Sequence, residues 1–147
     1  MSTDANKAIV VQLYDEVFNK GNLELAEKLV AEGAIEHDPN GLPVPSGPAG
    51  VTTVVTMLRT AFPDCHQTIE DLVAEGDRVA ARLSFQGTHQ GTFLGAAPTG
   101  KRISITMMHL YRFAGGKVAE VWANRDDIGV MRQLGLLPQP SPAASHS

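Results

Sequence analysis

The segment spanning residues 120–126 combines a large aromatic ring with an acid where a strand is expected to end. Asp126 follows Trp122 by four residues and begins an amphipathic stretch. A carboxylate at the rim of an apolar cavity resists ionisation, because burial disfavours the charged form. Such a group can transfer protons near neutral pH. Aspartate is also a favoured helix N-cap, so Asp126 has a catalytic and a capping interpretation, and Asp127 is available as the cap in its place.

The first half of the sequence predicts three helices. Apolar residues recur every three or four positions across residues 5–19, 22–33 and 49–61, with Asp4 as the expected first cap. A short extended piece at 34–38 and a loop rich in proline and glycine at 40–50 separate the second helix from the third.

The second half changes to the period of two that is typical of strands. Strands are expected at residues 66–74, 78–87, 101–113 and 117–125, followed by a helix at 126–134. The glycine-bearing loop at 88–100 is expected to act as a lid. Helices followed by an antiparallel sheet predict an α+β domain over residues 1–137. The Pro/Ser/Ala-rich tail at 138–147 is expected to be disordered.

Composition narrows the class of protein. The chain has 147 residues and a net charge of −4, with no basic stripe, which argues against nucleic acid and anionic membranes as partners. No apolar run is long enough to span a bilayer, and no signal peptide is recognised. With Cys65 as its single cysteine, the chain can form no internal disulfide, and the cytoplasm is the expected compartment. Neither a zinc spacing nor a nucleotide loop is present, so no metal and no cofactor are expected.

The glycine pair Gly115-Gly116 sets a testable register for the last two strands. A two-residue turn there pairs Ala114 with Lys117, which places His109 opposite Trp122. Met107 then lies opposite Asn124. Residues opposite each other share a face, so these four side chains are expected to face a cavity together with Asp126, while Asp127 points away. A one-residue bulge would invert this assignment.

The other face of the same two strands is apolar enough to predict a homodimer contact. Its apolar members are Met108, Leu110, Val121 and Ala123.

Each candidate site residue has a structural alternative. His109 is either a donor to a substrate carbonyl, a partner that tunes Asp126, or a core histidine. Trp122 is a wall of the pocket, and Asn124 is either a donor to an enolate oxygen or an exposed residue at a strand end. The remaining candidates for substrate contact, with core or turn roles as alternatives, are Tyr14, Phe18, His37, Phe62, His89 and Met107.

Short motifs in a consistent order resemble the SnoaL-like polyketide cyclase family, within the nuclear-transport-factor-2-like superfamily. They span roughly residues 5–137 and include His37-Asp-Pro39, Ala61-Phe-Pro-Asp64, Ala74-Glu-Gly-Asp77, Gly87-Thr-His-Gln-Gly91, Pro98-Thr-Gly100, Glu120-x-Trp122, Asp126 and Gln133-Leu-Gly135.

The resemblance implies a cone-shaped fold in which a curved antiparallel sheet and the N-terminal helices enclose one deep pocket. It also implies ring closure of a hydrophobic polyketide by intramolecular aldol condensation, without cofactor or metal, and Asp126 occupies the position of the family's acid/base. Three alternatives remain. They are a pericyclic cyclisation in the same pocket without proton transfer, a non-catalytic domain that binds a small ligand, and an isomerase or hydrolase of the same superfamily.

Overall fold

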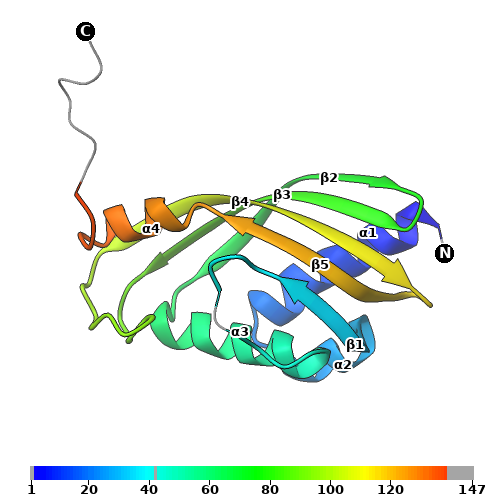
Figure 1. The fold of residues 1–147 in the computed structure, drawn as a ribbon, viewed down its shortest axis with the longest axis horizontal. Helices are drawn as coiled ribbons and strands as arrows, with labels where there is room; N and C mark the ends of the chain where they lie inside the picture. Colours follow the sequence, from blue (N-terminus) through cyan, green and yellow to red (C-terminus); the bar gives the residue numbers. More distant parts are fainter. Residues whose placement is uncertain (1, 42, 139–147) are drawn as a thin grey trace, which may run out of the picture.

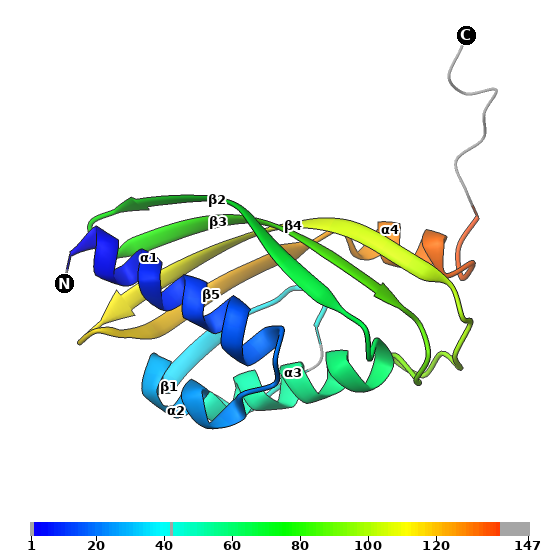
Figure 2. The same ribbon diagram turned by 180° about the vertical axis from the view of Figure 1, so that it is seen from behind.

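The computed structural model describes residues 2–41 and 43–138 (Figures 1 and 2). The predicted tail lies outside them, except for Pro138. The chain runs through α1 (Thr3–Gln12), the π-helix η1 (Leu13–Phe18), α2 (Leu23–Leu29), β1 (Val30–His37), α3 (Pro48–Ala61), β2 (His66–Glu75), β3 (Arg78–Thr88), β4 (Arg102–Ala114), β5 (Lys117–Arg125) and α4 (Asp127–Gln133). This order confirms the predicted α+β class.

The five strands form one curved sheet in the order β1-β5-β4-β3-β2. Strands β2 to β5 are antiparallel neighbours, whereas β1 runs parallel to β5 along one edge. The alternation predicted for β3 is confirmed, because its inward residues are all buried: Val79, Ala81, Leu83 and Phe85. Strand β1 begins at Val30, inside the segment predicted as the second helix, so that prediction was wrong for residues 30–33.

The helices lie against the concave face of the sheet. Figure 2 shows α1 crossing this face, with α2 and α3 below it and α4 beyond the end of β5. Helix α1 packs on β2 and β3, and α3 packs on β1 and α2. Ser2, rather than the expected Asp4, caps α1 by accepting a hydrogen bond from the Ala5 amide. No helix in the part of the chain that the structure describes is long and apolar enough to cross a membrane.

The wide turns of η1 bring two aromatic rings to the interior. Tyr14 and Phe18 lie one turn apart, and their rings stack with centroids 5.0 Å apart. The π-helical spacing is visible in the hydrogen bond from the Asn19 amide to the Tyr14 carbonyl, five residues back. Burying side chains of this size contributes about 1.5–3 kcal/mol each to stability.

A β-bulge in β5 decides which of its residues face inward. The predicted turn is correct, since Ala114 pairs with Lys117 and both turn glycines have positive φ. The register then shifts so that Arg112 pairs with Glu120, which leaves Ala119 as the extra residue.

Beyond the bulge, the predicted register is therefore wrong by one residue. Leu110 lies opposite Trp122, Met108 lies opposite Asn124 and His109 lies opposite Ala123. Because side chains alternate along a strand, Val121, Ala123 and Arg125 face inward, whereas Trp122 and Asn124 face outward. On β5, the outer face for which a homodimer contact was predicted therefore carries Trp122 and Asn124 in place of Val121 and Ala123.

The loop expected to be a lid is tied to the end of α3. The amides of Gln90 and Gly91 both donate to the carbonyl oxygen of Ala61, at 2.9 and 3.0 Å. A side chain at Gly91 would collide with the Thr60 carbonyl oxygen. Glycine at this position therefore lets the loop approach α3 closely.

We expect Gly91→Ala to lower the free energy of unfolding by about 1–3 kcal/mol, because the added Cβ overlaps backbone. Gly33→Ala is the matched control, since a Cβ there meets nothing within 4 Å. Urea denaturation of the three proteins measures both effects. Equal stability of the two variants would contradict the close approach.

Candidate active site

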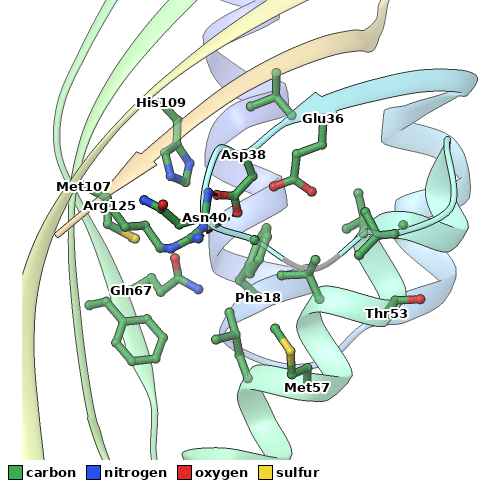
Figure 3. A pocket seen from close by; sticks show the side chains of 18 of the residues that line it. Phe18, Glu36, Asp38, Asn40, Thr53, Met57, Gln67, Met107, His109 and Arg125 are labelled. Carbon is green, nitrogen blue, oxygen red and sulfur yellow. Dashed lines mark hydrogen bonds and ion pairs between the residues drawn. The ribbon is translucent and has the colours of Figure 1, made fainter. Parts of the chain in front are cut away.

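A cavity of about 540 Å³ lies between the sheet and α3, within the size range of small-molecule sites (Figure 3). Its wall is largely apolar, and polar side chains gather where β1 ends. The apolar wall includes Leu13, Phe18, Val54, Met57, Leu58, Phe62, Phe85, Phe93, Ile103, Ile105, Met107 and Val121.

Two carboxylates enter the cavity from the end of β1. Glu36 and Asp38 flank His37, so the alternation of the strand turns both acids inward and the histidine outward. Figure 3 shows both carboxylates pointing into the cavity opposite His109 and Arg125. Pairing of Glu36 with Val121 brings this end of β1 beside the inward-facing end of β5.

Arg125 joins three elements at this end of the cavity. Its Nη2 lies 2.7 Å from Oδ2 of Asp38, and its Nε lies 3.1 Å from Oδ1 of Asp127, at the start of α4. The side chains of Arg125 and Asp38 are only 25% and 15% exposed, so each buried charge depends on its partner. The guanidinium group of Arg125 therefore forms ion pairs with two carboxylates.

Glu36 is the acid of this cluster that has no ion pair or hydrogen bond from its side chain within the residues described. Burial raises its pKa above the ordinary glutamate value, and the nearby Asp38 carboxylate raises the pKa further, against the opposing effect of Arg125. A carboxyl group with a raised pKa is better suited to accept and return a proton near neutral pH.

His109 is neutral at ordinary pH. Burial, which is the larger cause, and the Arg125 cation together lower its pKa to about 4, against the opposing effect of Asp38. Its Nδ1 lies 3.0 Å from the Tyr14 hydroxyl, which lies 2.5 Å from the Tyr111 hydroxyl. Its Nε2 is buried and has no hydrogen-bond partner in the described parts of the chain. The ring itself lines the cavity, and Nε2 is its nitrogen without a partner there.

Four of the side chains expected to contact substrate lie on the cavity wall: Phe18, Phe62, Met107 and His109. Tyr14 lies behind His109 in the core and reaches the site through that ring. His89 is fully buried in the loop after β3, where its Nδ1 lies 3.0 Å from the Thr99 hydroxyl. Its centroid is 5.6 Å from that of Phe62, so His89 supports the wall from behind.

Three of the predicted contacts, Trp122, Asn124 and His37, do not line the cavity. The inward placement predicted for Trp122 and Asn124 was wrong, and His37 lies on the outer face rather than at the mouth of the cavity. The bulge at Ala119 turns Trp122 and Asn124 outward. Trp122 stacks on His37 at 5.2 Å between centroids. His37 Nε2 lies 2.6 Å from Glu120 Oε2. These residues form an outer cluster rather than a pocket wall.

The two adjacent aspartates exchange the orientations expected of them. Asp126 is exposed and caps α4, because its Oδ1 accepts a hydrogen bond from the Gly129 amide at 2.8 Å. Asp127, expected to point away, lines the cavity. The acid/base role of Asp126 stays a prediction, and its position favours the capping interpretation.

Sequence reasoning missed Glu36, Asp38, Arg125 and Asp127 as cavity residues. A usable signal exists for the first two, since acids at alternate positions of an extended piece share one face. Arg125 has no comparable signal, because its direction depends on the bulge.

The comparisons with known proteins agree with this architecture. The sequence profile of the SnoaL-like polyketide cyclase family matches residues 8–134. Aklanonic acid methyl ester cyclase DauD from Streptomyces sp. (strain C5) is 34% identical over 134 residues, which cover 86% of this chain and 80% of that protein.

Solved structures give the same result. TsrD from Streptomyces laurentii superposes with a TM-score of 0.85 at 25% identity, over 93% of this chain and 99% of that one. IdmH from Streptomyces antibioticus superposes with a TM-score of 0.75 at 34% identity, over 88% of this chain and 98% of that one.

The lowered pKa of His109 predicts a specific loss of stability in acid. The unfolded chain protonates this imidazole below about pH 6.5, whereas the folded protein resists until about pH 4, so stability falls as the pH drops through this window. The contribution of this group is roughly 3 kcal/mol. Urea unfolding at both ends of the window measures it.

Other groups titrate in the same range, so the control is His109→Gln, which keeps a polar side chain but cannot titrate. The loss of stability between the two pH values should be smaller in this variant. Equal losses in the two proteins would show that His109 is not held neutral.

Proposed function

Because this chain belongs to the SnoaL-like polyketide cyclase family, we propose that it closes a ring in a hydrophobic polyketide by an intramolecular aldol-type condensation. The observation that carries the proposal is that one apolar cavity holds both a carboxyl group without an ion pair, Glu36, and a neutral imidazole, His109. A base and a hydrogen-bonding group are the two parts that enolate chemistry requires.

In the proposed reaction, Glu36 removes a proton from a carbon next to a substrate carbonyl. The electron pair of the broken C–H bond forms an enolate, whose oxygen is stabilised by a hydrogen bond from His109. The enolate carbon attacks a second carbonyl carbon of the same molecule and forms the new C–C bond. The resulting alkoxide takes the proton back from Glu36, so no external acid, base or oxidant is consumed.

The apolar wall would supply the proximity on which this reaction depends. Holding a flexible chain so that its nucleophilic and electrophilic carbons lie next to each other removes much of the entropic barrier of an intramolecular step. Phe18, Phe62 and Met107 are placed to hold such a chain against the sheet. The polar groups lie together near Glu36, where β1 ends.

The charges near Glu36 favour an uncharged substrate group at that end. Asp38 and Asp127 already neutralise Arg125, so no free cation is left in this cluster to receive a carboxylate. A free acid would meet two carboxylates and the Glu36 carboxyl, whereas an ester would not. The name of the relative DauD specifies a methyl ester, which agrees with this reasoning.

We expect Glu36→Gln to lower kcat by about 100-fold or more, because the amide cannot accept the proton. Asp126→Asn is the matched control, since asparagine caps a helix as well as aspartate does, and its turnover should stay within a few-fold of the wild type. The measurement is ring closure of a methyl-ester polyketide followed by chromatography and mass spectrometry.

The other outcomes separate the remaining candidates. Loss of turnover in Asp126→Asn alone would restore Asp126 as the acid/base. Full turnover in both variants would indicate a pericyclic cyclisation without proton transfer. Tight binding with no product would indicate a binding domain, and exchange of an α-proton without ring closure would indicate an isomerase.

We also propose that two copies pair through the outer face of the sheet, in the cytoplasm. This face exposes Met108, which is 58% accessible, beside Leu110 and Trp122. Light scattering should give a dimer for the wild type and a monomer for Met108→Glu, because a charge in an apolar contact is costly to bury. A monomeric wild type would contradict the proposal.

A further inference from the structure

Gln67 is a buried polar side chain in the wall of the cavity that has no part in the proposed reaction. It is only 4% exposed and is the second residue of β2. The alternation of the strand turns it inward between His66 and Thr68, which are exposed. Figure 3 shows its amide projecting from the sheet into the cavity.

The backbone of Gln67 is held on both sides. On one side Gln67 pairs with Phe85 of β3. On the other side β2 is the edge of the sheet, and the side chain of Asn19 takes the place of a further strand. Its Nδ2 donates to the Gln67 carbonyl oxygen and its Oδ1 accepts from the Gln67 backbone amide, both at 2.8 Å. Since Asn19 directly follows η1, the end of that helix fixes where the Gln67 side chain enters the cavity.

The side-chain amide of Gln67, in contrast to its backbone, has no partner within the protein. No hydrogen bond joins Oε1 or Nε2 to any residue that the structure describes. Both atoms remain accessible from the cavity. The amide therefore has a free donor and a free acceptor directed at the space that a substrate would fill.

A substrate that fills the cavity would displace solvent from this amide. A buried amide that gives up its bonds to water and gains none is costly, so a hydrocarbon group in this place would bind with a penalty. A carbonyl or hydroxyl oxygen would take over the hydrogen bonds. A site built in this way discriminates against the analogue that lacks the oxygen.

The surroundings of Gln67 suit a flat ring. Phe85, its neighbour across the strands, packs edge to face with Phe62, with centroids 5.5 Å apart. Phe93 packs on Phe62 in the same manner, at 5.2 Å. All three rings line the cavity. Aromatic side chains in this arrangement offer faces and edges against which a further ring can pack.

Gln67 and His109 lie at different levels of the sheet. Gln67 pairs with Phe85, which in turn pairs with Ile105 of β4. Ile105 precedes His109 by four positions, which corresponds to about 13 Å along the strand. Glu36 enters the cavity from β1, at the opposite edge of the sheet. A substrate that contacts both places therefore extends along the strands.

We propose that Gln67 binds an oxygen substituent, a carbonyl or hydroxyl group, on a ring of the substrate that lies away from the reacting carbons. Gln67 is then a specificity-determining residue, because it selects oxygenated rings over their hydrocarbon analogues and fixes which end of the substrate faces Glu36. The inference rests on the proposed function for the position of the reacting carbons.

The test compares two probes of nearly the same shape, 2-naphthol and 2-methylnaphthalene, which differ by a hydroxyl group in place of a methyl group. Equilibrium dialysis measures the affinity of each probe for the wild type and for Gln67→Met, which keeps a similar volume without the amide. The preference for 2-naphthol should fall about tenfold in the variant. An unchanged preference, or failure of the wild type to bind 2-naphthol, would overturn the inference.

Glu36→Gln is the comparison variant in the same measurement. Its preference for 2-naphthol should equal that of the wild type, because the hydroxyl group lies at Gln67. If Glu36→Gln changed the preference and Gln67→Met did not, the hydroxyl group would lie at the acids of β1, which would contradict the proposed site.

Urea denaturation separates a binding role of Gln67 from a structural one. Gln67→Met and Gln67→Leu should be at least as stable as the wild type, because neither substitution removes a hydrogen bond within the described protein. A clear loss of stability in both variants would show that the amide serves the fold and would overturn the inference.

The inference and the proposed function can fail separately. A reduced preference in Gln67→Met together with full turnover of Glu36→Gln would overturn the proposed base and leave the Gln67 site. An unchanged preference together with an inactive Glu36→Gln variant would overturn the Gln67 site alone.

Discussion

The site depends on one unpaired residue in β5. Side chains alternate along a strand, so an extra residue at Ala119 reverses the direction of everything that follows it. Without the bulge, Arg125 would face solvent, and Asp38 would stay in the cavity without its cation. Trp122 would then occupy part of the space that a substrate needs. The bulge therefore sets both the shape of the cavity and its charge.

Arg125 in turn divides the acids of the cavity into two kinds. Asp38 and Asp127 are held as its partners, and their charges are satisfied there. Glu36 lies near the same cation without an ion pair, so burial dominates and its pKa rises. The same cation and the same burial keep His109 neutral. Burial and this guanidinium group thus keep His109 neutral, and among the described residues of the cluster they leave Glu36 as the acid without an ion pair.

Several features were accessible from the sequence because they depend on local patterns. The alternation of Val79, Ala81, Leu83 and Phe85 predicted β3 and its buried face, and the glycine pair predicted the turn after β4. Which side chains of β5 face inward could not be predicted, because a bulge at an alanine has no signature in the sequence. The expectation that Asp126 rather than Asp127 faces the cavity was wrong for the same reason, since it depended on the phase of that strand.

The acids on β1 were missed for a different reason. The piece carrying Glu36 and Asp38 was recognised as extended, but nothing local indicates that it pairs with β5, more than eighty residues away. The predicted helix before this piece ended too late for a similar reason. Val30 fits the apolar stripe of a helix and also the interior of a strand. Tertiary contacts decided between the two.

The parallel pairing of β1 with β5 also bears on how the molecule assembles. The four antiparallel strands follow one another directly in the chain, whereas β1 must close a much longer loop to reach its partner. The entropy of closing that loop must be overcome before the pairing can form. The end of the cavity that holds Glu36 and Asp38 therefore lies on the edge strand whose pairing costs the most loop-closure entropy in this sheet.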